Sequence, residues 1–485
     1  MSPVFLLTAV FLPLVGGFLL GVMRLSDRWN KIVSYAVVVL TSVLTWVFIF
    51  AIRDQTFTLL EILPHYRISL RFDSLGKIFA GMVSLLWPFA LMYAFGYMKH
   101  DERRRNYISF YVMTYGVVLG LAFSENLLTM FIFYEILTFI TLPLIVHTNT
   151  SEARRAGRYY LYFSLSGSSL SLVGMIMLTQ YLGTNGFHLM LEATTAMEDS
   201  FYQIGFLLCF FGFGVKSALF PLHFWLPMAS TAPTPTTALL HAVAIVKAGV
   251  FALIRITYYN NGVALMGTWV QQVMIVFACI TVVYGSAMAL KEQHLKRRFA
   301  YSTISNLSYI ILAMSFMNQA GLVAALLHLI IHSITKICLF FCCGEIIENS
   351  GATYVYQLDG FFKKMPLTFV SFVLASCSIT GIPLFAGFVS KYYILSSSIL
   401  SGTAFSYLGM GCIILSAVMT AIYSLSVPFR AIVHSVNENN AELLSKANEK
   451  DREMLVPIVV FAILTVIFGI GSGWLVDLLV NLFAL

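Results

Sequence analysis

The chain has 485 residues, of which 59% are hydrophobic and only 11% are charged. Because about 25% of the residues of a typical soluble domain are charged, this composition excludes a protein whose surface mostly meets water. The net charge of +7 comes from Lys and Arg in short segments between apolar runs. That placement sets membrane topology and gives no indication of nucleic-acid binding.

Apolar runs long enough to cross a bilayer recur along the whole sequence. We expect an all-α polytopic membrane protein with about fourteen transmembrane helices. Their centres lie near residues 12, 41, 87, 115, 136, 170, 209, 247, 279, 308, 333, 380, 416 and 468. Apolar and polar residues alternate over residues 66–72, which predicts a strand of a small hairpin outside the membrane. The charged segment 438–453 predicts a helix at the membrane surface.

The basic residues divide the connecting loops into two sets. The loops between helices 1–2, 3–4, 5–6, 9–10, 11–12 and 13–14 carry 20 Lys and Arg, whereas the alternate loops carry four. The positive-inside rule places the first set in the cytoplasm and both termini outside. We therefore expect a multi-pass protein of the cell (inner, cytoplasmic) membrane.

A few charged residues lie within the expected spans. Glu135 occupies the middle of the apolar run MFIFYEILTFITLPLI. The five basic residues within spans are Lys216, Lys247, Arg255, Lys336 and Lys391. A charge at mid-membrane costs about 3 kcal/mol or more, so several in one chain indicate a shared function. A lone lysine near a helix end has a simpler explanation, because its long side chain can reach the interface.

Two of these lysines accompany helix-breaking residues. Lys216 precedes Pro221 and Pro227. Lys391 follows Gly381 and Pro383. Interrupted helices free backbone carbonyls within the membrane and mark ion sites in transporters. Two such breaks, each with a lysine, also predict an internal structural repeat.

The segment HLIIHSITK places three protonatable groups on one helix face. His328, His332 and Lys336 recur every four residues and form a stripe about 80° wide. This favours a proton relay over isolated interior histidines. Metal binding by the two histidines is disfavoured by the nearby lysine, so we expect no metal site. Lys247 shares the next charged helix with His241, near the start of that helix.

Glu135 could act together with a lysine. A carboxyl group buried alone stays neutral, whereas beside a lysine both groups can remain charged. A Glu–Lys contact that opens and closes would then load and release a proton. The sequence has no phosphate-binding glycine loop or catalytic triad, and its seven cysteines lack the spacing of a cluster, zinc or disulfide framework. We expect no cofactor on this chain.

A series of motifs in order resembles a known family. These motifs are FDSLGKIFA, GYM, SENLLTMFIFYE, LPMASTAPTPTTALLHAVAIVKAGVF, LKRRFAYSTISNLSYI, HLIIHSITKICLFFCCG and GIPLFAGFVSK. The chain is similar to the antiporter-like subunits of respiratory complex I, membrane-bound energy-converting hydrogenases and Mrp-type sodium/proton antiporters. The resemblance covers nearly the whole chain.

The resemblance implies roles for individual positions. Glu135 matches a fifth-helix glutamate that pairs with a lysine of the broken seventh helix, here Lys216. Lys247 matches the eighth-helix lysine, and Lys391 the terminal residue of the broken twelfth helix. The central relay corresponds to His328, His332 and Lys336. The resemblance gives auxiliary roles to His223, His241 and Arg158. Arg158 stands where relatives have a lysine near the Glu–Lys pair. Because arginine hardly deprotonates, Arg158 could modulate the pair but scarcely relay protons.

The resemblance also implies an organisation and partners. Residues 1–106 form helices 1–3, residues 107–257 and 258–430 form two inverted five-helix repeats (helices 4–8 and 9–13), and residues 431–485 form a cytoplasmic loop and helix 14. We expect a non-redox subunit of a translocase. Its partners would be other membrane subunits, including antiporter-like ones, and hydrophilic redox subunits that carry iron–sulfur clusters.

Three functions remain open at this level. The first is a proton-translocating subunit of a redox-driven, complex I-related assembly, either a quinone oxidoreductase or a membrane-bound hydrogenase. The second is a subunit of an Mrp-type Na⁺/H⁺ antiporter without redox chemistry, which would also handle Na⁺. The third is a scaffold that has lost transport. The retained buried charges argue against a scaffold, which would gain from replacing them with leucine.

Overall fold

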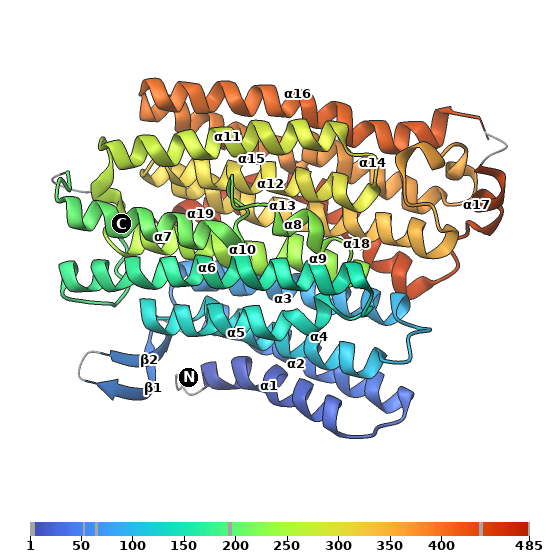
Figure 1. The fold of residues 1–485 in the computed structure, drawn as a ribbon, viewed down its shortest axis with the longest axis horizontal. Coiled ribbons are helices and arrows are strands. Elements are labelled where there is room, and N and C mark those ends of the chain that lie inside the picture. Colours follow the sequence, from blue (N-terminus) through green and yellow to red (C-terminus); the bar gives the residue numbers. More distant parts are fainter. Residues whose placement is uncertain (1–4, 52–53, 64–65, 193–195, 436–439, 484–485) are drawn as a thin grey trace.

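The computed structural model describes residues 5–51, 54–63, 66–192, 196–435 and 440–483. Its helices run side by side along one common direction, with a β-hairpin at one end and the short helix α17 (Ala441–Lys446) at the other (Figure 1). The all-α polytopic architecture expected from the sequence is confirmed. Because no irregular backbone can face lipid unpaired, helices are the natural spanning elements of such a chain.

Nine helical segments of the described chain are long and apolar enough to cross a membrane. They are α2 (Asp27–Ala51), α3 (Ser74–Tyr97), α5 (Leu127–Ile145), α6 (Ser151–Leu182), the run Thr234–Tyr259, α11 (Trp269–Lys291), α13 (Gln319–Ser350), α16 (Ala404–Val433) and α18 (Arg452–Ile470). The remaining long helices are α1 (Phe5–Val22), α4 (Arg104–Ala122), α7 (Ser200–Lys216), α12 (Leu295–Met314), α14 (Pro366–Thr380), α15 (Ala386–Ser401) and α19 (Ser472–Leu482). Each expected centre falls on a helix, and the total of fourteen spans stays a prediction.

The predicted hairpin is present. β1 (Thr56–Leu63) and β2 (Tyr66–Arg71) pair antiparallel. The end of β2 is tied to the bundle, because the Arg71 amide donates to the Phe123 carbonyl at 2.6 Å and Leu70 bridges Ser124. The charged segment 438–453 contains α17, and short 3-10 turns complete the connections: η2 (Gly262–Leu265), η3 (Val355–Gln357) and η4 (Phe361–Lys363).

Both predicted helix breaks are present. α7 ends at Lys216 and α8 (Trp225–Ala229) starts after a turn that contains Pro221. α14 and α15 are separated by residues 381–385, where Gly381 has a φ of +91° that disfavours other residues. The expectation that Pro227 breaks the helix is wrong. Pro227 lies inside α8, in its first turn. Backbone nitrogens in a first turn donate no intrahelical hydrogen bond, so proline is tolerated there.

A third irregularity was not predicted. The run Thr234–Tyr259 consists of α9 (Thr234–Ala238), the π-helix η1 (Leu239–Val243) and α10 (Ile245–Tyr259). Its backbone is therefore widened just before Lys247. π-Helical turns frequently occur at functional sites. The inverted repeats 107–257 and 258–430 stay a prediction, although each contains one helix break.

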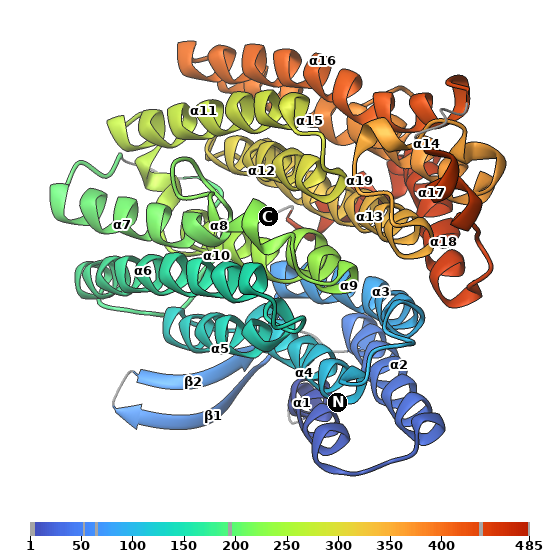
Figure 2. The ribbon, with the colours of Figure 1, turned by 45° about the vertical axis from the view of Figure 1, so that its right-hand side comes forward.

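The two most enclosed helical segments carry Lys247 and Arg255 in one and His328, His332 and Lys336 in the other. Within the most apolar 18-residue stretch of each helix, all residues of Thr234–Tyr259 and 94% of those of α13 are buried. In α2 and in α16 the corresponding share is 33%. Figures 1 and 2 both show α12 and α13 in the interior, between α16 on one side and α6 on the other. A helix that is apolar all round is buried in the core, whereas α2 and α16 present apolar faces outward.

The basic loops share one end of the bundle. Contacts that join them are Lys31–Glu453, Arg104–Asp27, His147–Asp101, Arg430–Asp359 and the His294–Tyr354 bridge. The hairpin, the loop after α6 and the loop after α10 meet at the opposite end. The grouping derived from charge therefore corresponds to one face of the protein. The orientation of that face in the cell stays a prediction.

Candidate functional site

Three expected relay residues follow one face of α13. His328, His332 and Lys336 are all buried, as their spacing in the central helix requires. The ring centroids of the two histidines lie 5.9 Å apart. Lys336 donates to the Phe299 carbonyl of α12 at 3.1 Å and lies above the Phe299 ring. The interior thus contains a row of three protonatable groups.

Lys247 joins this row from α10. Its Nζ lies 2.8 Å from Nδ1 of His332 and donates to the Leu329 carbonyl at 3.3 Å. A lysine amine and an imidazole nitrogen can both donate, so one of them must offer a lone pair at this contact. The shared proton can therefore lie on either atom. The contact is suited to proton transfer between α10 and α13.

The other end of the row reaches the break between α14 and α15. Nδ1 of His328 lies 2.9 Å from Oγ of Ser390, which directly precedes Lys391 on α15. Lys391 donates to the carbonyls of Ile379 and Thr380, each at 2.8 Å. These carbonyls lie in the last turn of α14 and lack helical partners because the helix stops there. The helix break thus builds a site for a buried ammonium group at the negative end of α14.

An aromatic ring lies between His328 and Lys391. The Tyr309 ring of α12 is 5.4 Å from the His328 ring and 5.4 Å from Nζ of Lys391. Its hydroxyl donates to Ser416 of α16 at 2.7 Å. The groups around His328 therefore come from α12, α13 and α15.

Glu135 and Lys216 lie next to each other without a direct ion pair within the described part of the chain. Lys216, the last residue of α7, donates to the Tyr134 carbonyl, and its Nζ lies 3.3 Å from the centre of the Tyr134 ring. Glu135 accepts a hydrogen bond from Ser168 of α6. The closed pair that the sequence suggested is thus open in this structure.

Glu135 is also less enclosed than the sequence suggested. Its side chain is only half-buried, and Ile136 and Phe139 on the same helix are exposed. Glu135 therefore lies between the buried Lys216 and the exposed outer face of α5. Ser168, which supplies its hydrogen bond, could not be identified from the sequence because α6 contains many serines.

The two halves of the site meet where α10 packs on the end of α7. A Cβ placed on Gly249 would lie 2.6 Å from the amide nitrogen of Ser217, the residue after Lys216. Only glycine permits this approach, and Gly249 is two residues from Lys247. Lys216 and Lys247 are therefore carried by backbones in direct contact.

The auxiliary residues differ in their surroundings. His241 lies within η1, and its Nε2 is 3.2 Å from Oγ of Ser230. His223 is buried in the turn before α8, where it stacks on Phe224 at 4.3 Å. Neither ring nitrogen of His223 has a hydrogen-bond partner among the described residues. Among the described residues, His241 thus has a hydrogen-bond partner with which it could exchange a proton, whereas His223 has none.

Arg158 lies far from the Glu135 carboxyl group. It is ten residues before Ser168 on α6, which corresponds to about 15 Å of helix. The side chain is exposed and lines a cavity between α5 and α6. The position that the family resemblance implied, near the Glu–Lys pair, is therefore wrong for this side chain.

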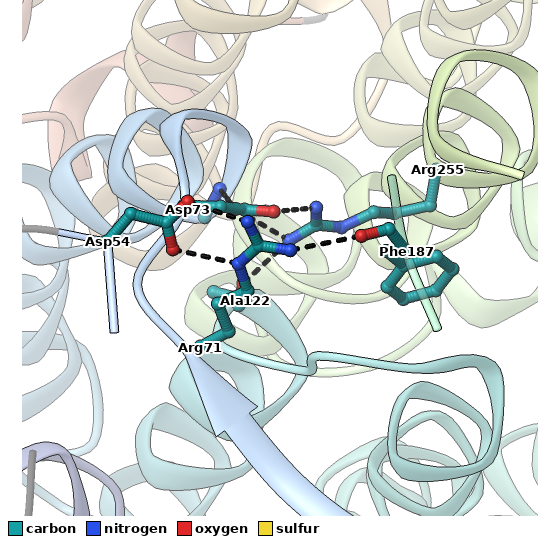
Figure 3. Close-up of polar contacts among 7 residues, drawn as sticks. Asp54, Arg71, Asp73, Ala122, Phe187 and Arg255 are labelled. Carbon is teal, nitrogen blue, oxygen red and sulfur yellow. Dashed lines mark hydrogen bonds and ion pairs between the residues drawn. The ribbon is translucent and has the colours of Figure 1, made fainter. Parts of the chain in front are cut away.

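Sequence reasoning missed a buried ion pair beside the hairpin. Both terminal nitrogens of Arg255 donate to the Asp73 carboxylate, and the two side chains are 0% and 6% exposed (Figure 3). Arg71 binds Asp54 with two hydrogen bonds and donates to the Phe187 carbonyl at 3.0 Å. The signal was an arginine within a span, but its partner lies 182 positions away. This cluster ties the hairpin to α3 and α10.

A second missed group lies near the basic end of α13. Glu345 is fully buried, and Asn349 donates to one of its oxygens at 2.9 Å. Its other oxygen has no partner among the described residues. Asn349 and Glu348 line a cavity of about 870 Å³. The apolar sequence around Glu345 gives the same signal as that around Glu135, so a full list of carboxyl groups within spans would have found it.

In the part of the chain that the structure describes, no group of three or more His, Cys, Asp or Glu residues is placed to hold a metal ion. The cysteines described are all free.

Residues 124–420 match the family described as "NADH:quinone oxidoreductase/Mrp antiporter, TM". The chain belongs to this family. The matched residues include every expected relay position from Glu135 to Lys391, so the resemblance seen in the sequence is confirmed. The chain is an antiporter-like membrane subunit related to Mrp and complex I-like assemblies.

Curated relatives include the "Na(+)/H(+) antiporter subunit A1" of Staphylococcus aureus, which is 29% identical over 98% of this chain. The match spans 62% of that relative, so this chain corresponds to about three-fifths of its length. The same subunit from strain Newman is 28% identical over the same share.

Two solved structures share the fold. One is from a membrane-bound sulfane sulfur reductase, described as an archaeal respiratory membrane complex; it matches with a TM-score of 0.85 and 24% identity over 99% of this chain and 97% of the other. The other is from the Mrp complex of Dietzia sp. DQ12-45-1b, with a TM-score of 0.83 and 24% identity over 99% of this chain and 51% of the other. Both come from multi-subunit membrane complexes.

Proposed function

We propose that this chain moves protons along its buried row of side chains as a subunit of a redox-driven membrane complex. One observation carries the proposal: Nζ of Lys247 lies 2.8 Å from His332, the rings of His332 and His328 lie 5.9 Å apart, and His328 lies 2.9 Å from Ser390, the residue before Lys391. All of these side chains are buried. Such groups are costly within a membrane and mark proton pathways.

The side chains in this row have complementary chemistry. His332 accepts a proton from Lys247 at Nδ1 and releases one from Nε2, because imidazole can exchange protons at both nitrogens. His328 repeats the step toward Ser390, and ring rotation bridges the 5.9 Å between the two rings. Lys391 is the last acceptor, held by the carbonyls at the end of α14. Protons thus cross between the two halves of the bundle.

Lys216 and Glu135 would control loading of the row. In the open arrangement Lys216 contacts the Tyr134 carbonyl and Glu135 contacts Ser168. Closing the pair would favour the charged forms of both groups, and opening it would favour their neutral forms. A change in this contact therefore moves a proton off Lys216 toward Lys247, which the Gly249 contact holds close by.

The driving force would come from partner subunits. We assign electron transfer to hydrophilic subunits with iron–sulfur clusters, and we assign no redox cofactor to this chain. The fold match to a chain of a respiratory membrane complex along 97% of that chain supports this branch. Other antiporter-like subunits would cover exposed faces such as that of α5.

A second candidate is a subunit of an Na⁺/H⁺ antiporter without redox chemistry. The S. aureus relatives, named as antiporter subunit A1, favour it. In this candidate the half-buried Glu135 carboxylate and carbonyls freed at the helix breaks would supply oxygen ligands for Na⁺. The relay would then run on ion gradients alone.

The composition of the purified complex distinguishes these candidates. We expect the complex isolated in mild detergent to contain hydrophilic subunits and many iron atoms, and to pump protons during electron transfer. A complex without iron, made only of small hydrophobic companions, would favour the antiporter.

Two variants test both transport candidates against a scaffold. Glu135→Gln and Lys216→Ala should abolish coupled proton flux and leave assembly intact. Normal flux in both variants, with normal assembly, would support a scaffold and overturn the transport function.

A further inference from the structure

A cavity of about 650 Å³ lies between the end of α5 and the start of α6, at the basic end of the bundle. The α6 residues that line it include Arg154, Gly157, Arg158 and Leu161, spaced three and four apart. They therefore form one stripe of the helix that faces the cavity. Val146 lies opposite on the α5 side, where a Cβ on Gly157 would approach its side chain to 2.4 Å. The absence of a side chain at Gly157 lets Val146 pack closely against α6 between the two arginines.

The cavity has a charged end and an apolar end. Arg154 donates to Asn149 at 3.2 Å, and within the described ranges no carboxylate pairs with Arg154 or Arg158. No acidic residue lines the cavity. Leu142 and Leu161 form its wall toward the middle of the helices. Two unpaired guanidinium groups above an apolar wall are complementary to a ligand with an anionic head and a hydrocarbon tail.

The length of α6 places this cavity at the depth of lipid head groups. The helix has 32 residues, which corresponds to about 48 Å. The hydrocarbon core is about 30 Å thick, so the first turns of α6 extend beyond it into the interfacial region. Basic pockets between transmembrane helices at this depth bind anionic lipid head groups.

We propose that this cavity binds an anionic phospholipid. The phosphodiester lies between Arg154 and Arg158, and one acyl chain follows Leu142 and Leu161 toward the membrane interior. Arginine suits this task because its planar guanidinium group can form two parallel hydrogen bonds with one phosphate. The proposal gives Arg158 a role separate from the proton relay.

The test measures lipid binding by the intact complex in phosphatidylcholine vesicles that contain spin-labelled phosphatidylglycerol. The fraction of immobilised label reports bound lipid. The variant R154Q/R158Q is compared with R155Q/K364Q, which removes the same charge at the same end of the bundle. Arg155 stacks on Tyr159 and does not line the cavity. Lys364 is exposed between α13 and α14.

We expect R154Q/R158Q to lower phosphatidylglycerol affinity about 25-fold, because it removes both guanidinium–phosphate contacts, which the control leaves in place. The control should retain the wild-type affinity, and phosphatidylcholine should bind weakly to all three proteins. Equal affinities in both double variants would overturn the proposal. Displacement of the lipid by inorganic phosphate alone would show a site for a free anion, and failure of any lipid to exchange would show a cavity covered by a partner protein. Either result would also overturn it.

Discussion

The ion pair of Asp73 and Arg255 gives a sharp prediction about stability. Asp73→Asn removes the negative charge and still offers a side-chain oxygen to cap α3, because asparagine is as good a capping residue as aspartate. Arg255 then remains fully buried, with its guanidinium group 4.7 to 5.1 Å from the Tyr259, Phe251 and Phe187 rings. Removing one partner of a buried pair costs about 3–5 kcal/mol. We expect D73N to lower the free energy of unfolding by that amount.

The neighbouring exposed pair provides a matched control. Asp54 binds Arg71 through two hydrogen bonds, and its side chain is 46% exposed. Because surface ion pairs contribute about 1 kcal/mol or less, Asp54→Asn should have a small effect. The reversible unfolding of the purified protein in mixed micelles, followed by tryptophan fluorescence during titration with dodecyl sulfate, measures both variants.

A double variant separates the pair from its surroundings. Arg255→Met retains an apolar stem among the rings, so D73N/R255M should regain most of the stability that either single variant loses. We expect a coupling energy of about 3 kcal/mol between the two positions. The reasoning would be refuted if D73N cost no more than D54N, or if the two single losses simply added.

Three further predictions concern the relay and the basic end. Ser390→Ala removes the hydroxyl that contacts His328 and should lower proton flux into vesicles about fivefold. Ser397→Ala, on the same helix, should leave the flux unchanged. Equal fluxes in the two variants would contradict proton transfer from His328 to Ser390. Lys247→Arg keeps the charge but hardly deprotonates, so it should block the same flux as fully as Lys247→Met; normal flux with arginine would argue against proton release at this position. Burial lowers the pKa of His294 in the loop before α12 to about 4, so stability should fall as the pH drops from about 6.5 toward 4. His294→Gln should flatten that part of the thermal-stability profile, and an unchanged slope would exclude His294 as its cause.

Much of the architecture could be predicted from local patterns. Apolar runs gave the helices, alternation gave the β2 strand, and breaker residues near Lys216 and Lys391 gave the two interruptions. The stripe on α13 followed from spacing alone, because helical geometry fixes which residues share a face. The grouping of basic loops followed from charge, and loop contacts now place those loops at one end.

The remaining features depend on contacts between distant segments. Ser168 beside Glu135, Ser390 beside His328 and Asp73 beside Arg255 are separated by 33, 62 and 182 positions. No local pattern distinguishes these residues from other serines and aspartates of the chain. The π-helix before Lys247 was missed because its sequence, LLHAV, contains no helix-breaking residue. Arg158 was misplaced because its position on α6 lies ten residues, about 15 Å, before Ser168, the residue that contacts Glu135.

The most direct test of the account measures proton uptake by vesicles that contain the purified complex with His332→Leu. His332 lies between Lys247 and His328, so no proton can pass along the row without it. The matched control is His188→Leu, which alters an exposed histidine in the loop after α6. The account predicts that His332→Leu abolishes uptake while assembly and the control remain normal. Uptake at the wild-type rate in the assembled His332→Leu complex would contradict it.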